Sequence, residues 1–115
     1  MCIRDRVGTV LLLAPESGTS AVHRAALGDP SRGDTVITRA FTGRPARALP
    51  NAFIATYDRE APAGYPALHH LTSPLRRASA AAGDPERVHL WAGTGYRKAV
   101  DQPAETVLQG LAAAL

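Results

Sequence analysis

The chain has 115 residues, the length of one ordinary domain, and carries a formal net charge of +3 with a pI near 9.6. Alanine dominates its 45% hydrophobic content and only 5% of the residues are aromatic, so large side chains for a thick core are scarce. The basic residues are spread out without interleaved aromatics, which argues against nucleic-acid binding. A single cysteine, Cys2, excludes an internal disulfide and a cysteine-based zinc site.

The N-terminal residues differ from the rest of the chain. Residues 1–6, MCIRDR, show no periodicity and resemble the translated leader that sequencing-adaptor sequence leaves on assembled metagenomic fragments. On this interpretation they are not native, and the native sequence begins mid-protein at about Val7. No apolar run approaches the roughly 18 residues that cross a bilayer, and the start lacks the apolar core of a signal peptide. We therefore expect a cytoplasmic protein without a membrane partner.

The first predicted elements lie before residue 28. Residues 7–13, VGTVLLL, favour either a buried strand or the first turns of a buried helix, and so short a run does not separate the two. Pro15 ends this element in both cases. Ser17, Thr19 and Ser20 are candidate N-caps for a short helix over residues 21–27.

Three arginines, Arg39, Arg44 and Arg47, crowd around Pro45 in the central stretch TVITRAFTGRPAR. Residues 36–37 favour an extended or buried segment. A helix is expected from Arg44 to about residue 57, and Pro50 should restart or kink it. The arginines have two interpretations. They are solvated or form surface ion pairs, or they clamp a loop near an anionic ligand. The candidate ion-pair partners are Asp34, Asp58 and Glu60.

Helical spacing dominates the second half. Pro66 opens a helix, and Thr72 is expected to cap a second one with Pro74 in its first turn. One apolar face runs through both segments. It consists of Leu68, Leu71, Leu75, Ala78 and Ala82. After a short apolar stretch at 88–91, a last amphipathic helix begins at residues 102–103. Its apolar face consists of Val107, Leu108, Leu111 and Leu115.

The chain alone shows no catalytic constellation. Gly93-Thr94-Gly95 suggests a phosphate-binding turn only weakly, because Lys98 stands at the third glycine of a dinucleotide motif. Gly8-Thr9 is an equally weak signal, with free backbone amides that could face a phosphate if a helix begins there. The alternative for each pair is a simple glycine turn. The four histidines have no carboxylate or cysteine at ligand spacing, so no metal site is expected. They are His23, His69, His70 and His89.

Four blocks of the sequence together resemble the C-terminal third of the nitronate monooxygenases, formerly called 2-nitropropane dioxygenases. The blocks are GTVLLLAPESGTSAVHRAAL, TVITRAFTGRPARAL, APAGYPALHHLTSPLR and LWAGTGYR. They cover nearly everything from Val7 onward, in the family's order and with family-like gaps.

The resemblance implies an α/β fold, namely a C-terminal fragment of an FMN-binding (β/α)8 TIM barrel that is itself mainly helical. Residues 7–14 would be the end of barrel strand eight and its phosphate-site turn. Residues 15–86 would form the lid or substrate domain, and residues 87–115 would return to the barrel with its closing helix. The missing N-terminal barrel portion of the same protein would be its partner.

The resemblance also implies the cofactor site. A Gln-Met/Val-Gly-Thr motif of the family binds the FMN phosphate, and Val7, Gly8 and Thr9 match it, in agreement with phosphate sites at the ends of barrel strands. Arg6 stands at the glutamine position, which we attribute to the foreign leader. Thr94 replaces the usual glutamine of the family's WAGQG block, a departure that affects any contact dependent on that glutamine.

The implied activity of the parent enzyme is oxidation of alkyl nitronates with O2 to carbonyl compounds and nitrite, with electron transfer by the flavin. The family's catalytic histidine lies upstream, so no catalytic residue is expected here and the fragment alone is expected to be inactive. Two alternatives stay open. One is a related enoyl- or quinone-reductase on the same flavin barrel, and the other is a small helical interaction module without catalysis.

Overall fold

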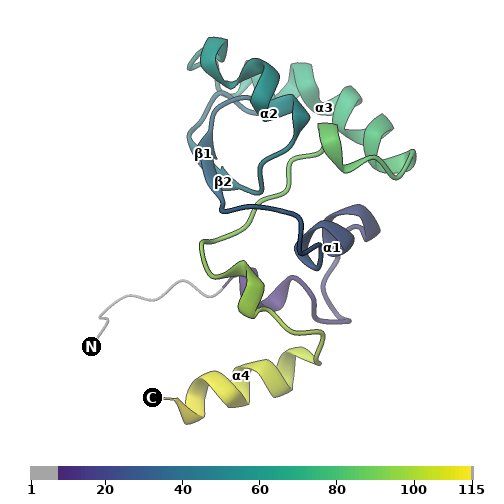
Figure 1. Cartoon of the computed structure of the whole chain (residues 1–115), viewed down its shortest axis with the longest axis vertical. Coiled ribbons are helices and arrows are strands. Elements are labelled where there is room, and N and C mark those ends of the chain that lie inside the picture. The colour runs from purple at the N-terminus through teal and green to yellow at the C-terminus, as the bar shows by residue number, and fades with distance from the viewer. Residues whose placement is uncertain (1–7, 115) are drawn as a thin grey trace.

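The computed structural model describes residues 8–114. Figure 1 shows the strands with two helices at one end of the molecule and the last helix at the other, over a longest extent of 44 Å. The α-helices are α1 (Ala21–Leu27), α2 (Ala52–Tyr57), α3 (Ala67–Ala81) and α4 (Ala104–Ala113). The strands are β1 (Val36–Thr38) and β2 (Ala46–Ala48). The 3₁₀ helices are Thr9–Leu11, Asp58–Glu60, Pro85–Arg87 and Tyr96–Lys98.

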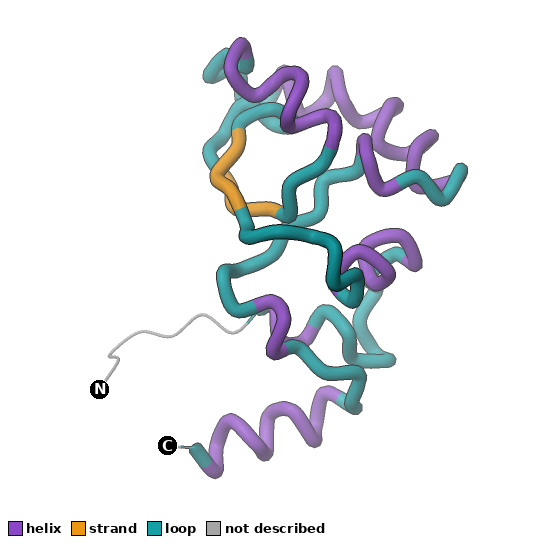
Figure 2. Tube along the Cα trace, viewed as in Figure 1, coloured by secondary structure: helices purple, strands orange, loops and turns teal. Residues whose placement is uncertain are grey.

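β1 and β2 pair antiparallel in a hairpin, drawn in orange in Figure 2. A third extended segment lies beside β2. The Leu49 N–H donates to the carbonyl oxygen of Leu90 at 2.9 Å, and the Ala92 N–H donates to that of Arg47 at 3.2 Å. The apolar stretch predicted at residues 88–91 is therefore the segment that ties the C-terminal part of the chain to the hairpin.

The helix predicted from Arg44 to about residue 57 is wrong in its first half, because residues 46–48 form β2 and the helix begins only at Ala52. Gly43 is the physical reason for the hairpin. Its φ of 84° is left-handed, and an added Cβ would lie 2.7 Å from the backbone nitrogen of Gly64. Only glycine fits such a turn without strain, and the turn sends the chain back along β1.

The break predicted at Thr72 is also wrong, since residues 67–81 form one helix, α3, with Pro74 inside it. Thr72 is buried, and its hydroxyl donates a hydrogen bond to the carbonyl oxygen of Phe41 instead of capping a helix. Pro74 and the residue four positions earlier, His70, are exposed. The carbonyl group that the missing proline N–H leaves without a partner can therefore bind water.

The core has two parts. One part surrounds Leu27, Leu49 and Leu90 and joins α1 to the extended segments. The other surrounds Phe41 and Phe53, whose rings stack with centroids 4.7 Å apart. Although the chain has few aromatic residues, its two phenylalanines meet in one place and fill that part of the core.

The two ends of the described chain pack together. Residues 8–13, for which a strand or a helix was predicted, form turns and the 3₁₀ helix Thr9–Leu11, which packs against α4. The predicted last helix is confirmed as α4. Its Val107 is buried and its Leu108 is half exposed, while Leu115 lies outside the described residues. The side chain of Glu16 accepts a hydrogen bond from the Ala104 N–H at 2.7 Å, and so caps α4.

The predicted helix over residues 21–27 is confirmed as α1. Ser20 caps it by accepting a hydrogen bond from the His23 N–H at 3.2 Å. Arg24 extends back from α1 and donates to the carbonyl oxygens of Leu13 and Ala14 at 2.9 and 2.7 Å. α1 thereby fixes the loop that follows the first 3₁₀ helix.

Candidate functional site

The first 3₁₀ helix is joined directly to a loop that lies 84 residues later in the sequence. The Oγ1 atom of Thr9 accepts a hydrogen bond from the N–H of Gly93 at 2.8 Å. A Cβ atom on Gly93 would lie 3.3 Å from that oxygen, so the close approach favours glycine. The structure therefore brings together two glycine-containing motifs that lie far apart in the sequence.

Gly8 lies on an open surface at the start of this 3₁₀ helix. It is exposed, its φ of −55° is open to any residue, and no atom lies within 4 Å of the position that a Cβ would occupy. The first N–H groups of a helix have no carbonyl partners within the helix itself. The surface at Gly8 therefore has room for a ligand close to the backbone. Val7 lies outside the described residues.

Gly93-Thr94-Gly95 forms a turn that leads into the 3₁₀ helix Tyr96–Lys98. The Tyr96 side chain is buried, and its hydroxyl donates a hydrogen bond to the Gly33 carbonyl oxygen at 2.9 Å. This contact fixes the turn against the loop before β1. Thr94, at the family's glutamine position, is exposed.

The three arginines around Pro45 form none of the ion pairs found within residues 8–114. Arg44 stacks over the Tyr65 ring, 5.0 Å from its centroid, and Arg47 donates to the Thr35 hydroxyl at 3.1 Å. Asp58 accepts hydrogen bonds from the Thr38 hydroxyl and the Arg39 N–H, at 2.7 and 3.0 Å. Of the two alternatives for the arginines, solvation or surface ion pairs, pairing with Asp58 is not observed, because Asp58 instead holds the end of β1.

A cluster of two histidines and an arginine was not predicted. Arg76 of α3 is only 6% exposed, and its guanidinium contacts the Nδ1 atoms of His69 at 3.0 Å and His89 at 3.3 Å. The spacing of seven residues between His69 and Arg76 places them on one helix face, and this was the available sequence signal. His89 comes from the distant extended segment, so its presence could not be predicted.

Burial lowers the pKa of two of the histidines, His89 and His23. It lowers the pKa of His89 to about 4, with smaller contributions from the positive charge of Arg76 and from His23 and His69. Burial also lowers the pKa of His23, against a smaller opposing effect of its hydrogen bond to the Trp91 carbonyl oxygen at 3.0 Å. Within residues 8–114, no group of three or more histidine, cysteine, aspartate or glutamate side chains is arranged to hold a metal ion.

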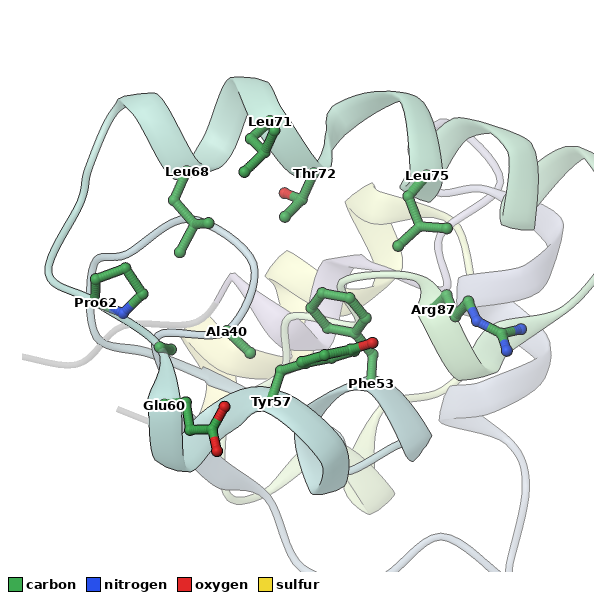
Figure 3. A pocket seen from close by; sticks show the side chains of 11 residues that line it. Ala40, Phe53, Tyr57, Glu60, Pro62, Leu68, Leu71, Thr72, Leu75 and Arg87 are labelled. Atoms are coloured by element: carbon green, nitrogen blue, oxygen red, sulfur yellow. The ribbon is translucent and has the colours of Figure 1, made fainter.

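An apolar groove of about 450 Å³ lies between α2 and α3. Figure 3 shows Leu68, Leu71 and Leu75 of α3 facing the Phe53 and Tyr57 rings across it. The predicted apolar face of α3 therefore lines this groove and is not buried in the described chain, since Leu71 is 76% exposed.

None of the helices within residues 8–114 combines the length and the hydrophobicity needed to span a membrane.

The fold and this arrangement define a mainly helical α/β segment. The segment superposes on the crystal structure of nitroalkane oxidase from Streptomyces ansochromogenes with a TM-score of 0.90 and 51% identity, over 93% of this chain and 31% of that one. The expected fold class is thereby confirmed.

Residues 5–113 match the family model described as nitronate monooxygenase. The probable nitronate monooxygenases of Staphylococcus aureus strains Newman and JH9 are 38% and 37% identical to the chain over 109 residues. The match covers 92% of this chain and 30% of each relative. The chain therefore belongs to the nitronate monooxygenase family, and it spans about a third of the length of these relatives.

Proposed function

We propose that the protein to which this chain belongs is an FMN-dependent nitronate monooxygenase, which oxidises alkyl nitronates with O2 to carbonyl compounds and nitrite. The observation that carries the proposal is the superposition on nitroalkane oxidase at 51% identity, since relatives this similar usually keep the chemistry of their site. Membership of an enzyme family disfavours the helical interaction module.

The proposed domain organisation follows the resemblance. Residues 7–14 were expected to contribute the end of barrel strand eight and its phosphate-site turn; because residues 8–14 form turns and the 3₁₀ helix Thr9–Leu11, the described part of this range is assigned to the turn alone. Residues 15–86 form the lid, and residues 87–115 return to the barrel with α4 as the closing helix. Packing of α4 against the 3₁₀ helix Thr9–Leu11 supports this, because both segments are assigned to the barrel. The missing barrel portion is the proposed partner of this surface. Residues 1–6, assigned to a foreign leader, lie outside the described residues.

The proposed FMN phosphate site consists of Val7, Gly8 and Thr9. The described residues fit a phosphate group, because Gly8 has no side chain and no neighbouring atom that would block its backbone. The hydrogen bond from the Gly93 N–H holds the Thr9 side chain in place. The N–H groups at the start of a helical turn point toward the position of an anion. When bound, the flavin supplies the electron-transfer chemistry.

No residue of this chain is proposed as the catalytic base. The pKa of His89 is lowered to about 4, too far from neutral pH for efficient proton abstraction, and we assign the base to the portion of the protein upstream. The role proposed for this chain is to bind the cofactor phosphate and to cover the reacting centre so that water is excluded.

The test uses a chimaera in which residues 8–115 replace the matching segment of the Streptomyces nitroalkane oxidase. Purified chimaera should contain about one FMN per chain, and with propane-2-nitronate it should consume O2 and release nitrite. The chimaera takes its catalytic base from the host enzyme, so the reductase alternative is tested in the full-length parent protein, where it predicts oxidation of a nicotinamide cofactor by an enone or quinone, without nitrite release. Loss of flavin and of nitronate oxidation in a folded chimaera would overturn the proposal.

A further inference from the structure

Arg76 is a buried cation without a buried anion. Its guanidinium is held by neutral acceptors only, namely the Thr72 hydroxyl at 3.3 Å, the His69 carbonyl oxygen at 2.8 Å and the two Nδ1 atoms of His69 and His89. Within residues 8–114 it belongs to no ion pair. Buried charges in proteins are usually paired, so the cluster has an uncompensated positive charge.

The direction of these hydrogen bonds fixes the state of both rings. A guanidinium has five N–H donors and no acceptor, so each Nδ1 atom that it contacts must be unprotonated. Each neutral imidazole therefore carries its proton on Nε2. The Nε2–H group of His89 points away from Arg76, because the two nitrogens lie on different sides of the ring.

This Nε2–H group lies at the surface. Among the described residues the His89 Nε2 atom has no hydrogen-bond partner. The one buried side-chain nitrogen or oxygen without a partner among these residues is Nε of Arg32, so the Nε2 atom of His89, which also has no partner, is not buried. His89 is thus a partly exposed donor whose other nitrogen is fixed from behind by Arg76.

His89 shares a face with Trp91 and Gly93. Along this extended segment Val88, Leu90 and Ala92 are buried in the core, while the residues between them are partly exposed on the other side. The His89 and Trp91 rings lie 5.4 Å apart. Since a strand rises roughly 3.3 Å per residue, this face leads within about 13 Å from His89 to Gly93, which is bonded to Thr9.

We propose that the Nε2–H group of His89 donates a hydrogen bond to an anionic oxygen of the bound nitronate, and that Arg76 is the positioning residue that fixes the His89 ring. The inference rests on the proposed function for the identity of the anion. The nitronate would lie against the Trp91 ring, on the side of the segment that faces Thr9.

The electrostatics suit this role. The charged and titratable groups around His89 are Arg76 on α3, His69 on the same helix and His23 on α1, and each disfavours a second positive charge. His89 is therefore neutral at pH 7 and donates without taking up a proton, while the charge of Arg76 behind the ring strengthens the donor. A neutral imidazole of lowered pKa also polarises a substrate oxygen in triosephosphate isomerase.

The first test examines the arrangement in the 115-residue chain itself, by ¹⁵N NMR of its histidine rings. We expect His89 to be protonated on Nε2 and to titrate well below pH 6. Arg76→Met should move the His89 titration toward pH 6.5. The matched control Arg77→Met removes an exposed neighbouring charge and should move it little. A proton on Nδ1 of His89 in the folded chain would overturn the proposal.

The second test measures anion binding in the chimaera by isothermal titration calorimetry. The probe is isobutyrate, a carboxylate with the heavy-atom connectivity and the charge of propane-2-nitronate, compared with neutral isobutyramide. His89→Ala should weaken isobutyrate binding by about tenfold and isobutyramide binding less. His89→Gln, which keeps an N–H in a similar place, should restore part of the affinity. The control His70→Ala alters an exposed ring and should have no effect.

The outcomes separate this inference from the proposed function. Calorimetry does not depend on flavin or turnover, so a chimaera that oxidises no nitronate still reports whether His89 binds the anion. Unchanged isobutyrate affinity in a folded His89→Ala variant would overturn the inference even if nitronate oxidation were intact. If the isolated chain does not fold, the same NMR titration of the chimaera decides the arrangement. Arg76→Gln, which also removes the charge but keeps an N–H donor, replaces Arg76→Met if the latter does not fold.

Discussion

Thr9 and Gly93 are joined by a hydrogen bond of 2.8 Å from the Gly93 N–H to the Thr9 Oγ1 atom, across most of the length of the chain. This bond connects the proposed phosphate-site turn to the extended segment that carries His89 and Trp91. It also means that the Thr9 side chain has a structural task besides any contact with a ligand.

Thr9→Ala should therefore lower both stability and flavin affinity. Without the Thr9 hydroxyl the partly buried Gly93 N–H has no partner, which costs on the order of 1 kcal/mol in the free energy of unfolding. Loss of a hydroxyl contact to the phosphate should cost a similar amount in the free energy of flavin binding. Thr9→Ser keeps the acceptor and should remain within about 0.5 kcal/mol of the wild type. Urea denaturation and flavin titration of the chimaera measure the two effects. Equal stability of the alanine and serine variants would contradict the prediction that the Thr9 hydroxyl stabilises the fold through its hydrogen bond with Gly93.

Gly8→Val should lower flavin occupancy much more than Thr9→Ala does, without loss of stability. The Gly8 φ of −55° suits any residue and an added Cβ meets no protein atom within 4 Å, so the chain should fold normally. The valine side chain would instead occupy the space of the proposed phosphate. The measurement is flavin absorbance per protein after dialysis. Full occupancy in a folded Gly8→Val variant would refute the phosphate-site assignment.

Gly43→Ala should destabilise the fold strongly. The new Cβ would lie 2.7 Å from the backbone nitrogens of Gly64 and Tyr65, and φ at this position is 84°. Strain at such a position, together with the displaced backbone, is expected to cost roughly 2–4 kcal/mol. Gly33→Ala is the matched control, because nothing lies within 4 Å of its Cβ position. Thermal unfolding of both variants measures the difference, and a Gly43→Ala variant as stable as Gly33→Ala would show that the turn is not tight.

Stability should decrease below pH 6.5 because of His89. The unfolded chain takes up this proton near pH 6.5 and the folded chain only near pH 4, so between these values the unfolded state binds more protons and acid favours unfolding. The contribution of neutral His89 to the free energy of unfolding is fully present above pH 6.5 and is lost as the pH falls toward 4. After allowance for the partial exposure of the ring, it is on the order of 1–2 kcal/mol.

Urea denaturation of wild type and His89→Gln at pH 7.5 and pH 5 checks this prediction. The glutamine variant should lose less stability between the two pH values than the wild type. His70→Ala, which changes an exposed ring, should behave as the wild type does. An identical pH dependence in all three proteins would mean that His89 is not the group responsible.

The 115-residue chain is expected to self-associate through the exposed apolar side chains of the groove between α2 and α3, and Leu71→Asp should reduce this association without lowering the stability of the chain. Leu71 is 76% exposed on the groove between α2 and α3, and an exposed apolar face of this kind promotes association. Sedimentation velocity of both proteins measures the change. Leu90→Asp is the contrasting variant, since Leu90 is fully buried and its replacement should unfold the chain. If Leu71→Asp associates as much as the wild type does, the groove between α2 and α3 is not the surface through which the chain self-associates.

Local signals in the sequence determined several elements by themselves. The cluster of candidate N-caps Ser17, Thr19 and Ser20 predicted a helix over residues 21–27, which is α1. The β-branched pair at residues 36–37 predicted an extended segment, and the periodic apolar residues after Pro103 predicted α4. These features depend on residues a few positions apart, for which backbone propensity and capping are decisive. The resemblance of four separated blocks likewise indicated the family.

Tertiary contacts decided the rest. Residues 46–48 form a strand because Gly43 turns the chain onto β1, and α3 continues past Thr72 because that hydroxyl meets the distant Phe41 carbonyl. The candidate site arises in the same way, since Thr9 meets Gly93, and Arg76 meets His89, only in the folded chain. Burial then sets the charge of His89. Such contacts and such burial are properties of the packed chain, so no local pattern around either residue predicts them.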